Sequence, residues 1–199
     1  WSRQSTNAVL AWCNEVAGLP VHNFRKTRHN EAWKIDGERL NDARVATYGC
    51  PSCTMKCGIT IHDREGRESE LDYENVGLLG ANLDIFDLAQ VGSLNYLCDE
   101  YGIDTMSAGC TLSFYADAIE QGVVKGDFKF GDAERAKELL GLAARREGKL
   151  GNLLADGSLR MAREFGQGSE AYAMQVKGLD VAAYNCKFIP GQALSFGVA

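Results

Sequence analysis

The sequence lacks any apolar run approaching the about 18 residues that a membrane-spanning helix needs, so no transmembrane segment is predicted. It also lacks the pattern of a secretory signal peptide. Positive charge is scarce, because 21 Lys and Arg stand against 27 Asp and Glu and give a formal net charge of −6. Without a Lys/Arg stripe, this balance argues against a nucleic-acid-binding surface.

Histidine is rare as well, and the three present are His22, His29 and His62. None of them forms the second ligand pair that a zinc site usually shows beside a cysteine pair. The seven cysteines are an odd number, with three clustered and four scattered, which is unlike a secreted disulfide framework. A reducing cytoplasm and a metal cluster explain this cysteine usage better.

The clustered cysteines are Cys50, Cys53 and Cys57, at C-x2-C-x3-C spacing. Such spacing lets three thiolates point at one small object, and iron–sulfur clusters take this kind of ligation, usually from four cysteines. A zinc site remains an alternative. Structural or redox thiols are another, although a redox motif needs only C-x-x-C and leaves Cys57 without a role.

Helical periodicity dominates the chain, so we expect a mainly α, multihelical single domain over residues 1–199, with at most a short strand or hairpin. Alternation of Ile59 and Ile61 with polar neighbours predicts the strand. The start at Trp1 without a Met, and the end after an apolar run, suggest a domain excised from a larger enzyme. The predicted helices cover residues 4–17, 36–46, 84–100 with Asp84 as N-cap, 105–121, 133–147, 153–165 with an interruption at Gly157, and 191–198.

Two groups of acids draw attention. Glu74 lies in a stretch with few other charges, so burial is expected to raise its pKa toward neutrality and suit it to acid/base work. A Glu paired with a buried Arg is the structural alternative. Asp99 and Asp104 flank Gly102, and from the residues alone the simplest interpretation is that Asp104 caps the following helix while Asp99 is solvated.

Four sequence segments, in order, resemble the tungsten-pterin aldehyde:ferredoxin oxidoreductases. Any one of them is a weak signal, but together they extend over nearly the whole chain. They are residues 50–57 (CPSCTMKC), residues 72–82 (DYENVGLLGAN), residues 98–107 (CDEYGIDTMS), and residues 176–180 (VKGLD) followed by 183–184 (AY) and 190–194 (PGQAL).

The resemblance implies a three-domain enzyme of which this chain is the middle, helical domain, with a β-rich pterin-binding domain before it and a helical domain after it. The implied cofactors are a [4Fe–4S] cluster and a tungsten, or molybdenum, bis-pyranopterin. The fourth cluster cysteine is expected beyond Ala199, and Cys186 is a weaker local alternative. The implied site residues are the metal-binding Cys50, Cys53 and Cys57, the pterin-binding Asp99, Gly102, Ile103, Asp104 and Thr105, and the catalytic Glu74.

The implied reaction oxidises an aldehyde to a carboxylic acid, and the electrons pass through the cluster to ferredoxin or a partner subunit. An oligomer is expected for the whole enzyme. The sequence departs from the family after Tyr184, where Asn185-Cys186-Lys187-Phe188-Ile189 replaces an Asp-Pro-Arg-Gly type segment. A reductase of an aromatic acyl-CoA, like the related benzoyl-CoA reductases, therefore remains an alternative, as does a non-catalytic electron-transfer module.

Overall fold

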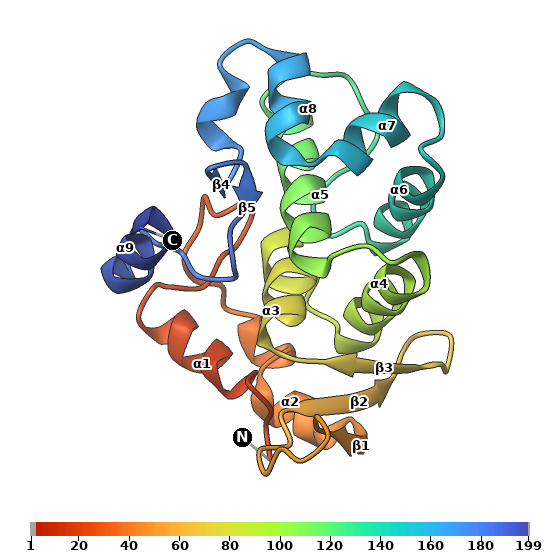
Figure 1. Ribbon diagram of the computed structural model, residues 1–199, viewed down its shortest axis with the longest axis vertical. Helices are drawn as coiled ribbons and strands as arrows, with labels where there is room; N and C mark the ends of the chain where they lie inside the picture. The colour runs from red at the N-terminus through yellow and green to blue at the C-terminus, as the bar shows by residue number, and fades with distance from the viewer. Residues whose placement is uncertain (1–2, 199) are drawn as a thin grey trace.

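The computed structural model describes residues 3–198, and the protein is 52% helical, which confirms the mainly α prediction. Figure 1 shows most helices stacked above a small sheet. No helix within the described residues is both long and apolar enough to cross a bilayer. The helices are α1 (Ala8–Glu15), η1 (Ala32–Lys34), α2 (Gly37–Asp42), α3 (Tyr73–Asn75), η2 (Val76–Gly80), η3 (Ala81–Leu83), α4 (Leu88–Tyr101), α5 (Thr105–Glu120), α6 (Ala133–Arg145), α7 (Gly148–Asp156), α8 (Ser158–Phe165), η4 (Ser169–Tyr172) and α9 (Pro190–Val198).

The main sheet is antiparallel, with strand order β1-β2-β3. The predicted strand is its centre, β2 (Gly58–His62), where Ile59 and Ile61 are buried and His62 is exposed. Its partners are β1 (Arg44–Tyr48) and β3 (Glu68–Leu71). The prediction of a helix through residue 46 is wrong at its end, because α2 stops at Asp42 and the chain then pairs with β2.

The predicted N-cap of α4 is wrong, because the helix is capped by Asp87, three residues after Asp84. Asp87 caps this helix by accepting a hydrogen bond from the Gln90 N–H at 3.1 Å. Asp84, the predicted cap, instead ends η3 in a left-handed conformation with φ 57°. Its Oδ2 lies 2.7 Å from Nδ1 of His22, a contact from a distant part of the chain that the local sequence does not encode.

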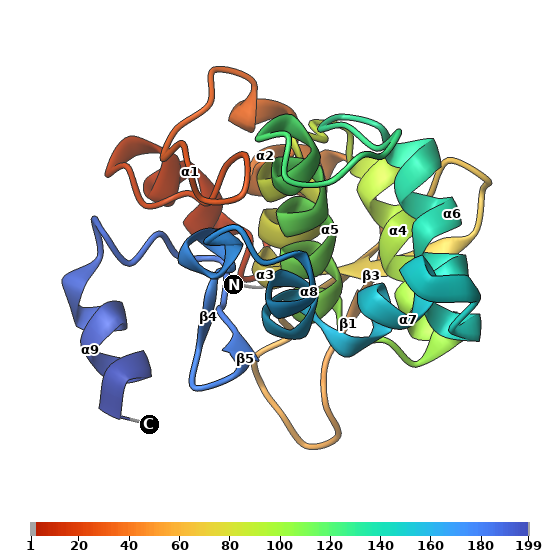
Figure 2. The ribbon, with the colours of Figure 1, turned by 90° about the horizontal axis from the view of Figure 1, so that it is seen from above.

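Helix α5 runs through the middle of the helical body (Figure 2). It begins after Asp104, whose Oδ2 accepts a hydrogen bond from the Ser107 N–H at 2.7 Å. Gly102 ends α4 with φ 65°, a conformation that glycine adopts without a Cβ penalty. The predicted boundary between these helices is therefore confirmed.

Glycine also separates α7 from α8. Gly157 stands between them with φ 88°, which confirms the predicted interruption, although α7 starts five residues earlier than expected, at Gly148. A short hairpin, β4 (Gln175–Val176) and β5 (Leu179–Asp180), then leads to an extended segment and α9. Helix α9 has no buried residues and lies beside the main body in Figure 2.

Candidate functional site

The three clustered cysteines lie on the β1–β2 loop, which extends away from the body in Figure 2. Cys50 and Cys53 are exposed and Cys57 is half-buried. A turn joins the first two, since the Cys53 N–H donates to the Cys50 carbonyl at 3.0 Å. Within residues 3–198, no three His, Cys, Asp or Glu side chains converge as a metal site.

The donor chemistry of this loop nevertheless fits an iron–sulfur cluster. Three thiols stand within eight residues on an exposed loop, and deprotonated thiols are the ligands that iron clusters use. Ser52 between them adopts φ 63°, so the loop already turns sharply. Cys50, Cys53 and Cys57 would hold the cluster after the loop closes around it.

The second cofactor segment is the turn between α4 and α5. Asp99, Gly102 and Asp104 are exposed there, while Ile103 and Thr105 are half-buried. Burial raises the pKa of Asp99, opposed by the hydrogen bond from Asn95 Nδ2 to its Oδ2 at 3.2 Å. Exposed carboxylates are hydrogen-bond acceptors, and a pterin presents a row of N–H donors, so this turn fits the pterin edge by its chemistry.

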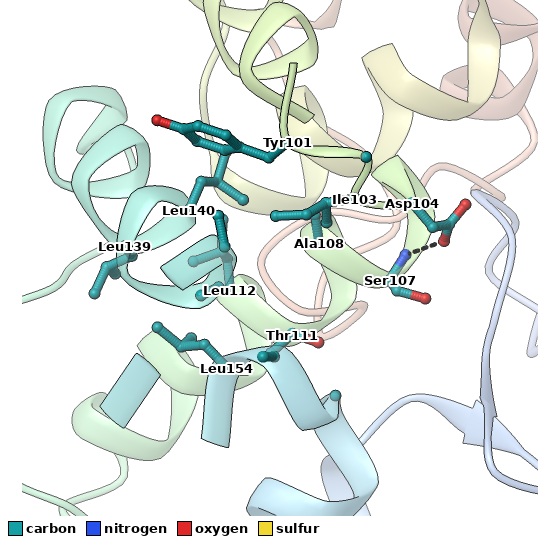
Figure 3. Close-up of a pocket in the computed structure, with 15 residues that line it drawn as sticks. Tyr101, Ile103, Asp104, Ser107, Ala108, Thr111, Leu112, Leu139, Leu140 and Leu154 are labelled. Carbon is teal, nitrogen blue, oxygen red and sulfur yellow. Dashed lines mark hydrogen bonds between the residues drawn. The ribbon is translucent and has the colours of Figure 1, made fainter. Parts of the chain in front are cut away.

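A cavity of about 300 Å³ lies beside this turn, between α5, α6 and α7, and aliphatic side chains make up most of its lining residues, together with Asp104, Ser107 and Thr111. Figure 3 shows Ile103 directed into it and Asp104 directed away, with its hydrogen bond to Ser107. Leu112, Leu140 and Leu154 also line the cavity. The turn therefore lies at the border of the cavity and contributes both Ile103 and Asp104 to its lining.

Glu74 lies in α3, which Asp72 begins with a capping box. The carboxylate is half-buried, and its Oε2 accepts a hydrogen bond from the Ala183 N–H at 2.7 Å. Burial raises the pKa of Glu74, the Ala183 N–H lowers it, and the negative charge of Asp72 raises it. The predicted direction is confirmed, and no Arg or Lys of residues 3–198 forms an ion pair with this group.

Asp180 lies in the segment 176–180 and is a further acid near the site that no sequence pattern marked. It is half-buried in β5 and accepts a hydrogen bond from Ser158 Oγ. Burial raises its pKa, while hydrogen bonds from Ser158 and Ser107 lower it. Its distance in sequence from Ser107 concealed this arrangement.

Three of these acids surround the first half of α5. Asp180, Asp104 and Glu74 each act electrostatically on the buried Cys110 thiol, whose pKa is raised mainly by burial. The fold thus brings together residues from α3, the α4–α5 turn and β5.

Known proteins with similar sequences and folds support this assignment. The family model described as "Aldehyde ferredoxin oxidoreductase, domains 2 & 3" matches residues 1–199. The tungsten-containing aldehyde ferredoxin oxidoreductase of Pyrococcus furiosus is 35% identical over 207 residues, covering 98% of this chain and 33% of that protein. The "Aliphatic sulfonate oxidoreductase, WOR-like subunit" of the same organism is 35% identical over 183 residues, covering 84% of this chain and 29% of that protein.

A solved structure of similar fold is the "Active site complex BamBC of Benzoyl Coenzyme A reductase in complex with 1,5 Dienoyl-CoA". It matches with a TM-score of 0.71 and 25% identity, and the match covers 85% of this chain and 27% of that one. The chain spans about a third of the length of the curated relatives it matches. From the match to the family model along its whole length, the chain belongs to the aldehyde ferredoxin oxidoreductase family.

Proposed function

We propose that this protein is a tungsten-pterin and iron–sulfur dependent oxidoreductase that oxidises an aldehyde and water to a carboxylic acid, releasing two protons and two electrons. The observation that carries the proposal is the half-buried Glu74, held by one backbone N–H and without an ion-pair partner in residues 3–198. Burial raises the pKa of a carboxyl group in this setting, which favours its exchange of a proton with substrate or water.

In this proposal, some residues of the chain bind the cofactors and Glu74 transfers a proton. When bound, the tungsten centre supplies two-electron redox chemistry and the [4Fe–4S] cluster carries single electrons. Asp99 and Asp104 hold the pterin edge as hydrogen-bond acceptors, with Gly102 shaping the turn. Glu74 accepts the proton of the attacking water through a carboxylate oxygen.

Backbone groups at Ile103 and Thr105 complete the pterin contact in this proposal. The Ile103 N–H donates to the Cys98 carbonyl at 2.8 Å, so the turn is fixed before a cofactor arrives. A rigid turn keeps the two flanking carboxylates at a constant separation. Preorganisation of this kind lowers the cost of binding.

Cys50, Cys53 and Cys57 would hold the cluster, which would supply a path for single electrons out of the domain. Because the loop that carries these cysteines is exposed, a ferredoxin or a partner subunit can approach it closely. We assign the chain to the middle domain of a three-domain enzyme, consistent with its coverage of about a third of its relatives. A cytoplasmic, oligomeric enzyme follows from the same assignment.

A second candidate is the reduction of an aromatic acyl-CoA. The fold similarity to the benzoyl-CoA reductase complex favours it, and so does the mostly aliphatic cavity, whose volume of about 300 Å³ accommodates an aromatic ring. A non-catalytic electron relay is disfavoured, because such a module has no use for Glu74 or the two pterin-facing aspartates.

The test uses the anaerobically purified, cofactor-loaded protein. Tungsten and iron are quantified, and reduction of ferredoxin is followed with aldehydes of increasing size. The proposal predicts aldehyde-dependent reduction in proportion to tungsten content. Reduction of benzoyl-CoA by a low-potential donor, without aldehyde oxidation, supports the second candidate, and a protein that holds iron but no tungsten contradicts both.

A further inference from the structure

The segment 181–185, which supplies the hydrogen bond to Glu74, is fixed at both ends. At its start, the Val181 N–H donates to the Met174 carbonyl at 3.3 Å, and the Val181 carbonyl accepts from Cys110 Sγ at 3.5 Å. At its end, the Asn185 N–H donates to the Gly18 carbonyl at 2.8 Å. The position of the residues between these anchors must come from other contacts.

Ala183, in the middle of this segment, is held by two consecutive side chains of α3. Its N–H donates to Glu74 Oε2 at 2.7 Å, and its carbonyl accepts from the Tyr73 hydroxyl. Ala183 is completely buried and Tyr73 is 1% exposed, so the bond from Tyr73 is shielded from bulk water, while the Glu74 carboxylate is half-buried. Buried hydrogen bonds with no solvent to replace them are costly to break.

A glycine of the next helical turn sets how closely Ala183 can approach. A Cβ built on Gly77 would lie 2.6 Å from the Ala183 Cβ, closer than two carbons can come without one of them moving. The same Cβ would stay 3.9 Å from the Tyr73 ring. The absent side chain of Gly77 therefore creates the space that Ala183 occupies.

We infer that Tyr73 and Gly77 are positioning residues, which hold the Ala183 backbone against α3 and thereby fix the Glu74 carboxylate for its reaction. The hydrogen bond from the Tyr73 hydroxyl holds Ala183 close to α3. The lack of a side chain at Gly77 leaves room for this close approach. Neither residue touches substrate in this scheme. The inference rests on the proposed function of Glu74 and adds the two residues that orient its carboxylate.

The Ala183 N–H also controls the charge of Glu74. Among the described groups that act on this carboxylate, it is the one that lowers the pKa, while burial and Asp72 raise it. The other titratable groups that interact with Glu74 are Cys13 of α1, Tyr73 of α3, Cys110 of α5 and Tyr184, and burial is the main cause that raises the pKa of each of these four groups. Loss of the Ala183 contact therefore raises the pKa of Glu74 further.

The first test replaces Tyr73 with Phe, which keeps the ring and removes the hydroxyl. The protonation of Glu74 is followed in the cofactor-loaded protein by infrared difference titration, with Glu74→Gln identifying the carboxylic-acid band. The midpoint is expected to move up by about 0.5–1 pH unit, the size of one modest hydrogen bond. The acidic limb of kcat per tungsten atom should move with it. A Tyr73→Phe protein with both midpoints unchanged contradicts the inference.

The second test displaces Ala183 without touching either polar side chain. Gly77→Ala should push Ala183 outward and raise the Glu74 midpoint as Tyr73→Phe does. Adding Ala183→Gly to this variant removes the colliding methyl group. The Glu74 midpoint of the double variant should therefore be close to that of Ala183→Gly alone. If Gly77→Ala leaves the midpoint unchanged, or if Ala183→Gly gives no rescue, the close contact does not position Glu74.

These measurements separate the inference from the function on which it rests. The midpoint of Glu74 protonation is measured by infrared spectroscopy without turnover. It therefore reports the contacts of the Glu74 carboxylate even if this group plays no part in the reaction. Unchanged turnover in Glu74→Gln contradicts the proposed function alone. A lower tungsten content in Tyr73→Phe with an unshifted midpoint assigns Tyr73 a merely structural role and overturns the inference.

Discussion

Replacing Gly109 with Ala is expected to force apart the two segments that carry the candidate site. Gly109 lies in α5, five residues after Asp104, and it packs directly on the backbone of Leu78, four residues after Glu74. A Cβ on Gly109 would lie 2.7 Å from the carbonyl carbon, the carbonyl oxygen and the Cβ of Leu78. To reach an ordinary contact of 3.4 Å, the two segments must separate by about 0.7 Å.

The size of the expected stability loss follows from the rigidity of this contact. Overpacking of a well-packed core costs about 1–3 kcal/mol, and Leu78 presents backbone atoms that no rotamer change can remove. The better helix propensity of Ala offsets at most about 1 kcal/mol of this destabilisation. The expected net loss of about 1–2 kcal/mol lowers Tm by about 2–8 °C for a chain of this size.

The assay is thermal unfolding followed by circular dichroism, with kcat per tungsten atom measured on the same samples. Gly141→Ala in α6 is the matched control, because its added Cβ would meet the flexible end of the Arg145 side chain at 3.3 Å and the Tyr101 hydroxyl at an ordinary 3.8 Å. The control should be as stable as the wild type or slightly more stable. A Gly109→Ala protein with the Tm and turnover of the control refutes the idea that this close contact sets the site.

Three further predictions concern cofactors and pH. Cys53→Ala should abolish the visible absorption and the reduced-state paramagnetic signal of a [4Fe–4S] cluster, and an unchanged signal means that Cys53 is not a ligand. Asp99→Ala should lower the pterin and tungsten content of a folded protein, whereas full occupancy reduces Asp99 to a helix-end residue. Glu65 has its pKa lowered to about 2, first by the Lys137 hydrogen bond and then by Ser93, so its stabilising effect is present above its unfolded pKa of about 4.5 and is lost as pH falls toward 2. Glu65→Gln should therefore reduce stability at pH 7 and make little difference near pH 2 in denaturant titrations.

Local signals were sufficient where a residue's own neighbours decide its conformation. Gly102 and Asp104 mark the α4–α5 boundary in the sequence as they do in the structure, because a left-handed glycine and a side-chain cap act within one turn. The alternation of Ile59 and Ile61 likewise identifies β2. The direction of the Glu74 pKa shift followed from its uncharged surroundings.

Contacts between distant segments decided the rest. Asp87 caps α4 in place of the predicted Asp84, and the Asp84 side chain instead contacts His22, 62 residues earlier in the chain. Residues 44–48 look like the end of a helix in the sequence. They form strand β1 because they pair with β2. The partner of Glu74 is a backbone N–H 109 residues later, and no side-chain pattern marks such a group.

The most direct test of the proposed chemistry is kcat per tungsten atom of Glu74→Gln with an aldehyde substrate. The glutamine keeps the size and hydrogen-bonding capacity of the side chain but removes its ionisable proton. If Glu74 transfers the proton, kcat should fall by about 10²–10⁴-fold while tungsten and iron contents stay at wild-type levels. Wild-type turnover per tungsten atom in this variant contradicts the account.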